Sequence, residues 1–257
     1  MKKLYSAILA STLVLGLSAT SAVAHEHADH TTEDKIKAAM QADIRSDAEK
    51  ERDRNRRPVE TLAFFGLEHD MKIVELLPGG GWYTKLLVPT VAEHGEYYAA
   101  IGTGTVKRTL GGEPGFESMN IVAEDAELWR EDGSRFYSMK LNSLGVSDVD
   151  MVLTFRNYHN FAEDGRAAMN KAAFEALKSG GIYAVVDHTA RHMEPLNDSN
   201  RRRFDPVKAI LEIQAAGFVL VDYSPIHYRE DDELEYEVGT KSVRGNSDRW
   251  TLKFVKP

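Results

Sequence analysis

The sequence has no cysteine. Among its 257 residues this absence excludes disulfides, thiol catalysis and a lipid-linked N-terminal cysteine. Positive charge is also scarce, since 32 basic residues face 40 acidic ones and leave a net charge of −8. That balance argues against nucleic acid and against an anionic membrane surface as partners.

The apolar stretch 8–17 is too short to span a bilayer. It follows Lys2 and Lys3 and precedes the triplet Ala22-Val23-Ala24. A basic start, a short apolar segment and an A-x-A end are typical of a cleavable signal peptide. We expect residues 1–24 to be removed, so that the protein is periplasmic or secreted and has no stable membrane insertion.

The next segment, 25–30, is rich in histidine. His25, His27 and His30 with two acids can hold a divalent metal loosely. Polar chain ends of this kind are more often disordered and solvated, because nothing fixes the ligands in place. We predict a disordered tail and assign no metal site.

Residues 31–66 are expected to form an N-terminal helical extension. The threonine pair 31–32 can cap a helix that reaches about Arg54, and Pro58 starts a second helix that ends at Gly66. The arginines near this junction alternate with acids, which favours a salt-bridged helix face over a phosphate-binding groove. These arginines are Arg52, Arg54, Arg56 and Arg57.

From residue 67 to 257, short apolar runs alternate with helical patterns. This alternation predicts one α/β domain with an open, mostly parallel sheet. The expected strands are 71–77, 97–101, 135–139, 149–155, 182–187, 218–222 and 249–255. The expected helices are 84–93, 116–130, 164–177 and 206–216, whereas the glycine-rich stretch 102–115 and the acidic stretch 230–233 are expected to be loops.

A glycine-rich turn follows the first expected strand. Without Cβ atoms, backbone N–H groups there can approach a carboxylate or phosphate at the positive end of a helix. Glu75, at the end of the strand, can accept a hydrogen bond from a ligand ammonium or hydroxyl. The alternative is a tight turn with no ligand. The candidate cofactor-binding residues are Glu75, Pro78, Gly79, Gly80, Gly81 and Tyr83.

Two further segments place polar side chains directly after apolar strands. Because the carboxyl ends of parallel strands open onto one crevice, we expect both segments to lie near the glycine turn. His159 can act as a general base, and Arg156 can clamp a carboxylate or phosphate. Asp187-His188 is an acid orienting a base, half of a metal site, or a turn. The candidate catalytic residues are His159, Asp187 and His188, and the candidate substrate-binding residues are Arg156, Asn157 and Asn160.

The glycine turn resembles the first motif of the class I S-adenosylmethionine (SAM)-dependent methyltransferases. Glu75, Gly79 and Gly81 stand in register with that acid and its Gly-x-Gly-x-Gly turn, and Leu77 replaces the first glycine. The turns 177–181 and 215–218 are similar to later landmarks of the same family. The resemblance implies a single Rossmann-like, mostly parallel seven-stranded sheet with helices on both faces, and SAM as the cofactor.

A closer similarity is to exported bacterial proteins known as predicted methyltransferases. It covers about 51–257, and it implies the architecture more strongly than the activity. It rests on Arg57-Pro58 with Phe64-Phe65-Gly66, Trp82-Tyr83-Thr84, Thr154-Phe155-Arg156-Asn157 with His159-Asn160, Val186-Asp187-His188, and Arg244-Gly245 with Asp248-Arg249.

Two acids usual in class I methyltransferases are missing from the expected places. The strand 97–101 ends without an acid for the cofactor ribose, and 139–142 has none near the adenine. A lost ribose contact costs about 1–3 kcal/mol, or roughly ten- to a hundredfold in affinity. An acid such as Glu124 or Asp125 can replace it, whereas a loop 103–115 that fills the pocket would prevent binding.

Two functions therefore stay open. One is a SAM-dependent methyltransferase acting on a small-molecule or cell-envelope acceptor. The other is an exported protein that reuses the fold to bind another small ligand or a metal, without methyl transfer. A dinucleotide-dependent dehydrogenase ranks third, because the turn lacks the third glycine of Gly-x-Gly-x-x-Gly.

Overall fold

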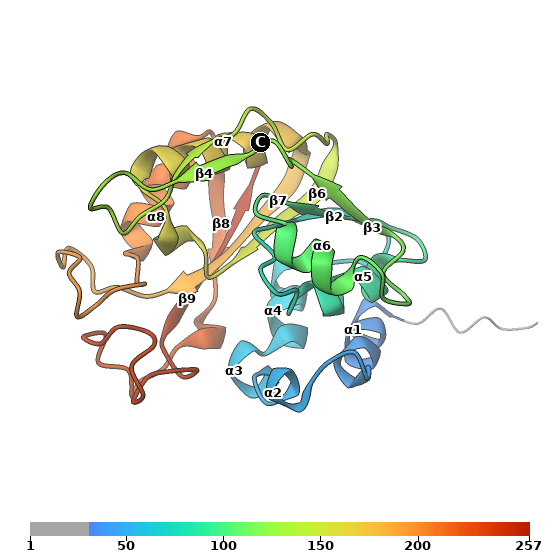
Figure 1. Cartoon of the computed structure of the whole chain (residues 1–257), viewed down its shortest axis with the longest axis horizontal. Helices are drawn as coiled ribbons and strands as arrows, with labels where there is room; N and C mark the ends of the chain where they lie inside the picture. Colours follow the sequence, from blue (N-terminus) through green and yellow to red (C-terminus); the bar gives the residue numbers. More distant parts are fainter. Residues whose placement is uncertain (1–30) are drawn as a thin grey trace, which may run out of the picture.

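The structure is a computed structural model that describes residues 31–257 (Figure 1). The expected signal peptide, 1–24, and the histidine-rich segment, 25–30, lie outside the described residues. Within 31–257, no helix has the length and apolar character needed to cross a bilayer.

A seven-stranded sheet in the order β3-β2-β1-β6-β7-β9-β8 forms the centre of the molecule. All neighbouring pairs are parallel except that β9 runs antiparallel to both β7 and β8. The strands are β1 (Lys72–Leu76), β2 (Glu96–Ala100), β3 (Met119–Val122), β6 (Val149–Phe155), β7 (Leu177–His188), β8 (Val219–Tyr223) and β9 (Arg249–Val255). Strand order reverses between β1 and β6, so a ligand crevice is expected at their carboxyl ends.

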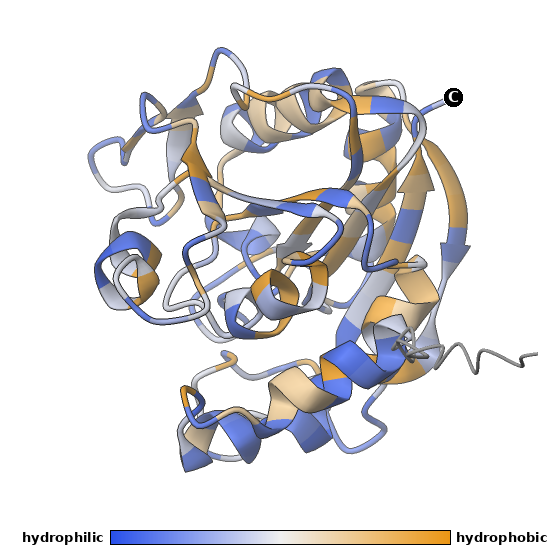
Figure 2. Cartoon of the chain, turned by 90° about the vertical axis from the view of Figure 1, so that its right-hand side faces the viewer, coloured by the Kyte–Doolittle hydropathy of each residue, from blue (hydrophilic) through white to orange (hydrophobic). Residues whose placement is uncertain are grey.

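Alternate residues of the central strands face two separate hydrophobic layers. Ile73 packs with the layer under α1, α4 and α5, whereas Val74 packs with the layer under α7 and α8. This is the two-residue period of a strand buried on both faces. Figure 1 shows α1 to α4 on one side of the molecule and α7 and α8 on the other, and Figure 2 shows hydrophobic residues concentrated in the strands between them.

Most helices form where capping residues and apolar spacing predict them. In α4, proline opens the helix and Gly66 closes it in a left-handed conformation with φ of 79°. The other helices that agree with expectation are α5 (Thr84–Val91), α7 (Glu163–Ala176) and α8 (Pro206–Ala215), and α4 itself spans Pro58–Phe65.

The single helix expected from the threonine pair to Arg54 is wrong, because the chain forms three short helices there. These are α1 (Thr32–Gln41), α2 (Asp47–Lys50) and α3 (Asp53–Arg56). The Ser46 hydroxyl accepts from Glu49 N while the Glu49 carboxylate accepts from Ser46 N, which makes a capping box. This local pair starts a new helix at Asp47, whereas α1 already ends at Gln41 because Ala42 takes a non-helical ψ of 142°.

The region 102–140 also differs from expectation. The loop expected at 102–115 contains the helix α6 (Gly104–Leu110), whose Val106 and Leu110 are buried. The helix expected at 116–130 is wrong, because it contains β3 and the short strand β4 (Glu127–Trp129). β4 pairs with β5 (Ser138–Lys140) in a separate two-stranded antiparallel sheet. The third strand of the main sheet is therefore 119–122 rather than 135–139.

The acidic stretch 230–233 is only partly a solvated loop. Asp232 is buried and accepts from both terminal nitrogens of Arg203, at 2.9 and 2.8 Å. This buried bidentate pair anchors the long connection between β8 and β9, so the expectation of a free loop is wrong at Asp232.

Candidate functional site

The glycine turn forms an open backbone surface directly after β1. A side chain added at Gly79 or Gly80 would meet no atom within 4 Å, and both residues are exposed. No hydrogen bond in the described part of the chain uses the N–H of either glycine. The turn is closed instead by Gly81 N, which donates to Pro78 O at 2.9 Å. Two backbone donors are thus left available to a ligand.

Gly81 has a different role from its neighbours. A Cβ there would lie 2.7 Å from Leu110 Cδ1 of α6, and its φ is 84°. Only glycine fits both the backbone conformation and the close contact. Gly81 was predicted to bind cofactor, but it does not line the cavity at the turn and instead packs against α6.

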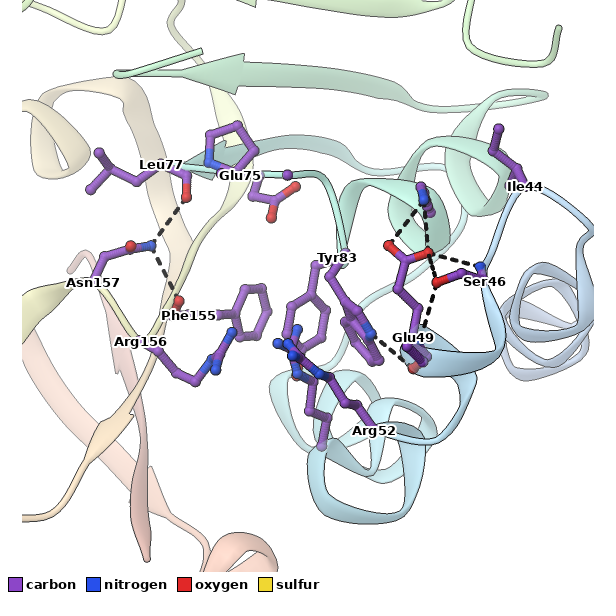
Figure 3. Close-up of a pocket in the computed structure, with 17 residues that line it drawn as sticks. Ile44, Ser46, Glu49, Arg52, Glu75, Leu77, Tyr83, Phe155, Arg156 and Asn157 are labelled. Atoms are coloured by element: carbon purple, nitrogen blue, oxygen red, sulfur yellow. Dashed lines mark hydrogen bonds and ion pairs between the residues drawn. The ribbon is translucent and has the colours of Figure 1, made fainter. Parts of the chain in front are cut away.

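A cavity of about 590 Å³ opens at the turn (Figure 3). Its walls come from three parts of the chain that are far apart in sequence: the turn itself, the segment after β6, and the N-terminal helices. The residues used below are Glu75, Pro78, Gly79, Gly80, Trp82 and Tyr83; Phe155, Arg156 and Asn157; and Glu49, Arg52 and Arg56.

Glu75 lies at the base of this cavity with 3% of its surface exposed. Its Oε2 accepts hydrogen bonds from the hydroxyls of Thr84 and Tyr97, at 2.7 and 2.6 Å. No hydrogen bond within residues 31–257 uses its Oε1. Burial raises the pKa of Glu75 to about 7, because desolvation outweighs the two hydroxyl donors. One carboxylate oxygen is therefore left for a ligand donor.

Aromatic rings form one wall of the cavity. Tyr83 stacks on Phe155 with ring centroids 3.5 Å apart and planes inclined by 10°. Trp82 meets Tyr83 edge-on and donates from Nε1 to Glu49 O at 3.0 Å. Trp82 and Tyr83 both line the cavity, as does Phe155.

His159 and Asp187 meet as an acid–imidazole pair. Asp187 is fully buried and accepts from His159 Nδ1 at 2.6 Å and from the backbone N–H groups of His159 and His188. The pair fastens the 3₁₀ turn Tyr158–Asn160 to the end of β7. Neither residue lines the cavity at the glycine turn.

His188 lines a second cavity, of about 790 Å³, beside the first. Its Nδ1 lies 2.8 Å from Ser247 Oγ, and no hydrogen bond in the described chain uses its Nε2. Burial, followed by the charge of Arg249, holds the pKa of His188 well below its usual value. The imidazole is therefore neutral at physiological pH.

The three predicted substrate-binding residues have separate positions. Arg156, in a left-handed conformation with φ of 62°, lines both cavities. Asn157 Nδ2 donates to Leu77 O and Phe155 O, each at 3.2 Å, and so joins the glycine turn to β6. Asn160 lines neither cavity, and its carbonyl accepts from Tyr137 N.

Arg56 lines both cavities but was not predicted as a site residue. Arg54 and Arg57 do pair with acids, as expected of a salt-bridged face. Arg56 is instead 4% exposed, with its guanidinium 4.2 Å from the Trp82 ring centroid. Alternation of charges along the sequence does not show which arginine turns inward, so no signal in the sequence identified it.

Acidic residues follow β3 closely, but no acid follows β2 at the corresponding place. Ile101 is fully buried where a ribose-binding acid is usual, and Leu77 Cδ2 lies 3.4 Å from the Cβ position of Gly102. Glu124 and Asp125 follow β3 closely. The prediction that no acid follows the third strand is therefore wrong, because it assumed that this strand was 135–139. Glu124 pairs with Lys107 at 2.7 Å, and neither acid lines the cavity.

Solved structures share this architecture. No protein-family model matches the sequence, and no curated protein matches it closely. A SAM-dependent methyltransferase from Aquifex aeolicus superposes with a TM-score of 0.53 at 16% identity, covering 88% of this chain and 98% of that one. The chain has the class I methyltransferase fold.

Two further structures show how much this fold can vary in activity. The glycopeptide N-methyltransferase MtfA superposes with a TM-score of 0.51 at 15% identity, over 80% of this chain and 91% of that one. The [4+2]-cyclase SpnF superposes with a TM-score of 0.50 at 12% identity, over 79% and 80%. At such identities a class I methyltransferase fold does not by itself specify the reaction.

Proposed function

We propose that the protein is a SAM-dependent methyltransferase acting on a small molecule. The observation that carries the proposal is the open glycine turn, whose two free N–H groups and the free Oε1 of Glu75 face one cavity. Backbone donors at a helix start suit a carboxylate, and a buried carboxylate suits an ammonium. An amino-acid group such as that of SAM carries both.

The cavity suits the amino-acid end of SAM better than it suits the ribose. Gly79 and Gly80 offer a cradle that a side chain would fill. Ile101 offers no hydrogen bond to ribose hydroxyls, and Leu77 packs against Gly102 beside it. We therefore expect SAM to bind roughly ten- to a hundredfold more weakly than it would with a ribose-binding acid present.

For methyl transfer the protein must position the cofactor and the acceptor and remove one proton from the acceptor. SAM, when bound, supplies an activated methyl group. Tyr83 and Phe155 shield one side of the cavity from water, and Arg156 orients the acceptor. Among the three residues predicted as catalytic, His188 alone lines a described cavity, so its free Nε2 is the candidate proton acceptor, although its lowered pKa makes it a weak base. Asp187 and His159 act by holding the neighbouring turn.

Titration calorimetry with S-adenosylhomocysteine and with SAM tests this proposal. Valine at Gly79 is a poor probe, since φ of 58° strains a β-branched residue. Leucine at Gly80 meets no atom at its Cβ and yet fills the cavity. We expect micromolar binding that Gly80→Leu abolishes. Gly112→Leu, at another glycine with open space, is the matched control. No binding at millimolar ligand would contradict the proposal.

A second candidate is a fold reused for another small ligand, without methyl transfer. The buried Ile101 and the packing of Leu77 on Gly102 favour it. Within residues 31–257 no cluster of His, Cys, Asp or Glu side chains is suited to a metal ion, so we favour an organic ligand. Both candidates are proposed for an exported protein, from the pattern of 1–24, and N-terminal sequencing of the periplasmic or secreted protein tests that location.

A further inference from the structure

Three arginines from distant segments converge beside the glycine-turn cavity. Arg56 belongs to α3, Arg156 follows β6, and Arg249 begins β9. All three line the cavity of about 790 Å³ that also contains His188. Figure 3 shows Arg156 and Arg52 reaching from opposite sides toward the space below Tyr83 and Phe155.

These arginines lack the acidic partners that other buried arginines of this chain possess. Arg45 pairs with Asp53 at 2.5 Å, Arg166 with Glu212 at 2.6 Å, and Arg203 with Asp232 at 2.8 Å. In contrast, among the described residues no carboxylate lies within ion-pair distance of Arg56, Arg156 or Arg249. Arg56, Arg156 and Arg249 therefore differ from these other buried arginines in having no acidic partner among the described residues.

Several of their polar atoms are also unused. Nε of Arg156 and Nε of Arg249 are buried without a hydrogen bond. Arg249 Nη1 donates to the carbonyl of Asn55 at 2.8 Å, while no hydrogen bond in 31–257 uses the Arg156 or Arg56 guanidinium. Asp187 is the acid that most favours the charge of Arg156, but its carboxylate already accepts three hydrogen bonds. Buried donors without partners are costly, so a bound acceptor is expected.

Mutual repulsion adds to that cost. Burial and then the charge of Arg156 lower the pKa of Arg56 to about 8, and the same two causes lower the pKa of Arg249 to about 10. A guanidinium keeps its proton under physiological conditions, so the lowered pKa values measure an unfavourable concentration of charge. A multiply charged anion placed among the three groups relieves this repulsion.

We propose that Arg56, Arg156 and Arg249 form a binding site for the phosphate group of a small phosphorylated molecule. A dianionic phosphate accepts from several guanidinium forks at once, whereas a carboxylate has fewer oxygens and one charge. The cavity of about 790 Å³ that these three arginines line is large enough for the phosphate and the rest of such a molecule, and Arg52 and Arg244 also line it.

The site deepens the proposed function, because it names the class of acceptor. The two cavities share Arg52, Arg56 and Arg156, so a molecule whose phosphate is held by the arginines in the second cavity lies next to the glycine-turn cavity. The assignment as acceptor site rests on the proposed methyltransferase activity. The binding of the phosphate itself does not.

The test measures thermal unfolding and calorimetric binding with inorganic phosphate, against potassium chloride at equal ionic strength. We expect phosphate to raise the melting temperature more than chloride does. In Arg156→Met the phosphate effect should vanish, with affinity at least tenfold weaker. The melting temperature of this variant without phosphate should be unchanged or higher, because one of three repelling charges is gone. A purely structural arginine predicts a lower value.

Two further variants sharpen the test. Arg108, exposed on α6 with its bonds confined to that helix, gives the charge-matched control Arg108→Met, which should keep the phosphate effect. Arg156→Lys retains the charge without the fork and should recover part of the affinity. Equal effects of phosphate and chloride, or a phosphate effect retained in Arg156→Met, would overturn the site.

S-Adenosylhomocysteine titrated into the same samples separates the two proposals. Phosphate binding without S-adenosylhomocysteine binding contradicts methyl transfer but supports the anion site. The reverse result overturns the anion site alone. If phosphate competes with S-adenosylhomocysteine, the arginines hold the cofactor carboxylate, and the acceptor assignment is wrong.

Discussion

Replacing Glu75 with glutamine is predicted to protect the folded protein from the destabilising effect of rising pH. Glu75 is buried beneath the glycine turn, and its Oε2 already accepts from Thr84 and Tyr97. Burial raises the pKa of its carboxyl from the usual 4.5 to about 7. The folded protein therefore binds this proton more tightly than the unfolded chain does.

The sign and size of the effect follow from that difference. Between pH 4.5 and 7 the unfolded chain loses the proton first, so the free energy of unfolding falls as the pH rises. A shift of one pKa unit corresponds to about 1.4 kcal/mol. The raised pKa of Glu75 therefore lowers the free energy of unfolding at pH 8 by about 3 kcal/mol. Glutamine keeps a carbonyl acceptor for the two hydroxyls and carries no charge. At pH 8 the variant should be more stable by up to about 3 kcal/mol, and at pH 4 by almost nothing.

Urea unfolding of both proteins at several values between pH 4 and 8 measures this difference. Glu124→Gln serves as control, because that exposed acid pairs only with Lys107. This variant should not gain stability over the wild type as the pH rises from 4 to 8. A stability difference between wild type and Glu75→Gln that is constant across the range would refute the reasoning. The same variant should weaken S-adenosylhomocysteine binding at pH 8 by tenfold or more, because an ionised acceptor for the ammonium is lost.

Two further substitutions test packing near the site. Asp232→Ala leaves Arg203 buried without its acidic partner and should lower the free energy of unfolding by about 3–5 kcal/mol in urea. The double variant with Arg203→Met should recover only part of the loss, because Asp232 also accepts from Leu234 N and Asp248 N. Gly81→Ala forces a Cβ against Leu110 at φ of 84° and should cost about 1–3 kcal/mol, whereas Gly80→Ala should be nearly neutral; equal losses at both glycines would contradict the packing role of Gly81.

The central strands were predictable because their local signal is strong. β6 and β9 have the bounds expected from sequence, and β1 differs by one residue at each end. In β6, apolar residues on both faces suit a strand covered by helices on either side. The helix α4 was equally clear, because proline at its start and Gly66 at its end both act locally.

The region 102–130 was mispredicted because its signals are weak or depend on tertiary contacts. β3 is a four-residue edge strand with no fully buried residue, so it shows neither an apolar run nor clean alternation. Counting glycines across 102–115 concealed α6, whose six residues after Gly104 contain none. That helix is held by burial of Val106 and Leu110, a contact that the sequence does not reveal.

The sequence predicted which segments meet at the candidate site, but it did not predict what each residue contacts there. The turn and the segment after β6 do meet, as the position of the strand-order reversal requires. Sequence reasoning could not separate Gly81, which packs against α6, from Gly80, which faces the cavity. Nor could it separate paired from unpaired arginines, since a partner such as Asp232 for Arg203 lies 29 residues away.

The charged groups of the site come from both the sheet and the N-terminal helices. The sheet supplies the glycine turn, Glu75 and the aromatic wall, which suit an amino-acid group. Helix α3 supplies Arg56, and Arg52 is its N-cap residue. Glu49 of α2 fastens this region to helix α5 through Lys85 at 2.8 Å and to the glycine turn through Trp82. Moving these helices changes both the volume and the charge of the cavity without disturbing any strand. Arg156 and Arg249, by contrast, come from the ends of β6 and β9, so both parts of the chain contribute to the proposed anion site. Substitutions at Arg56 should alter anion binding while the sheet remains intact.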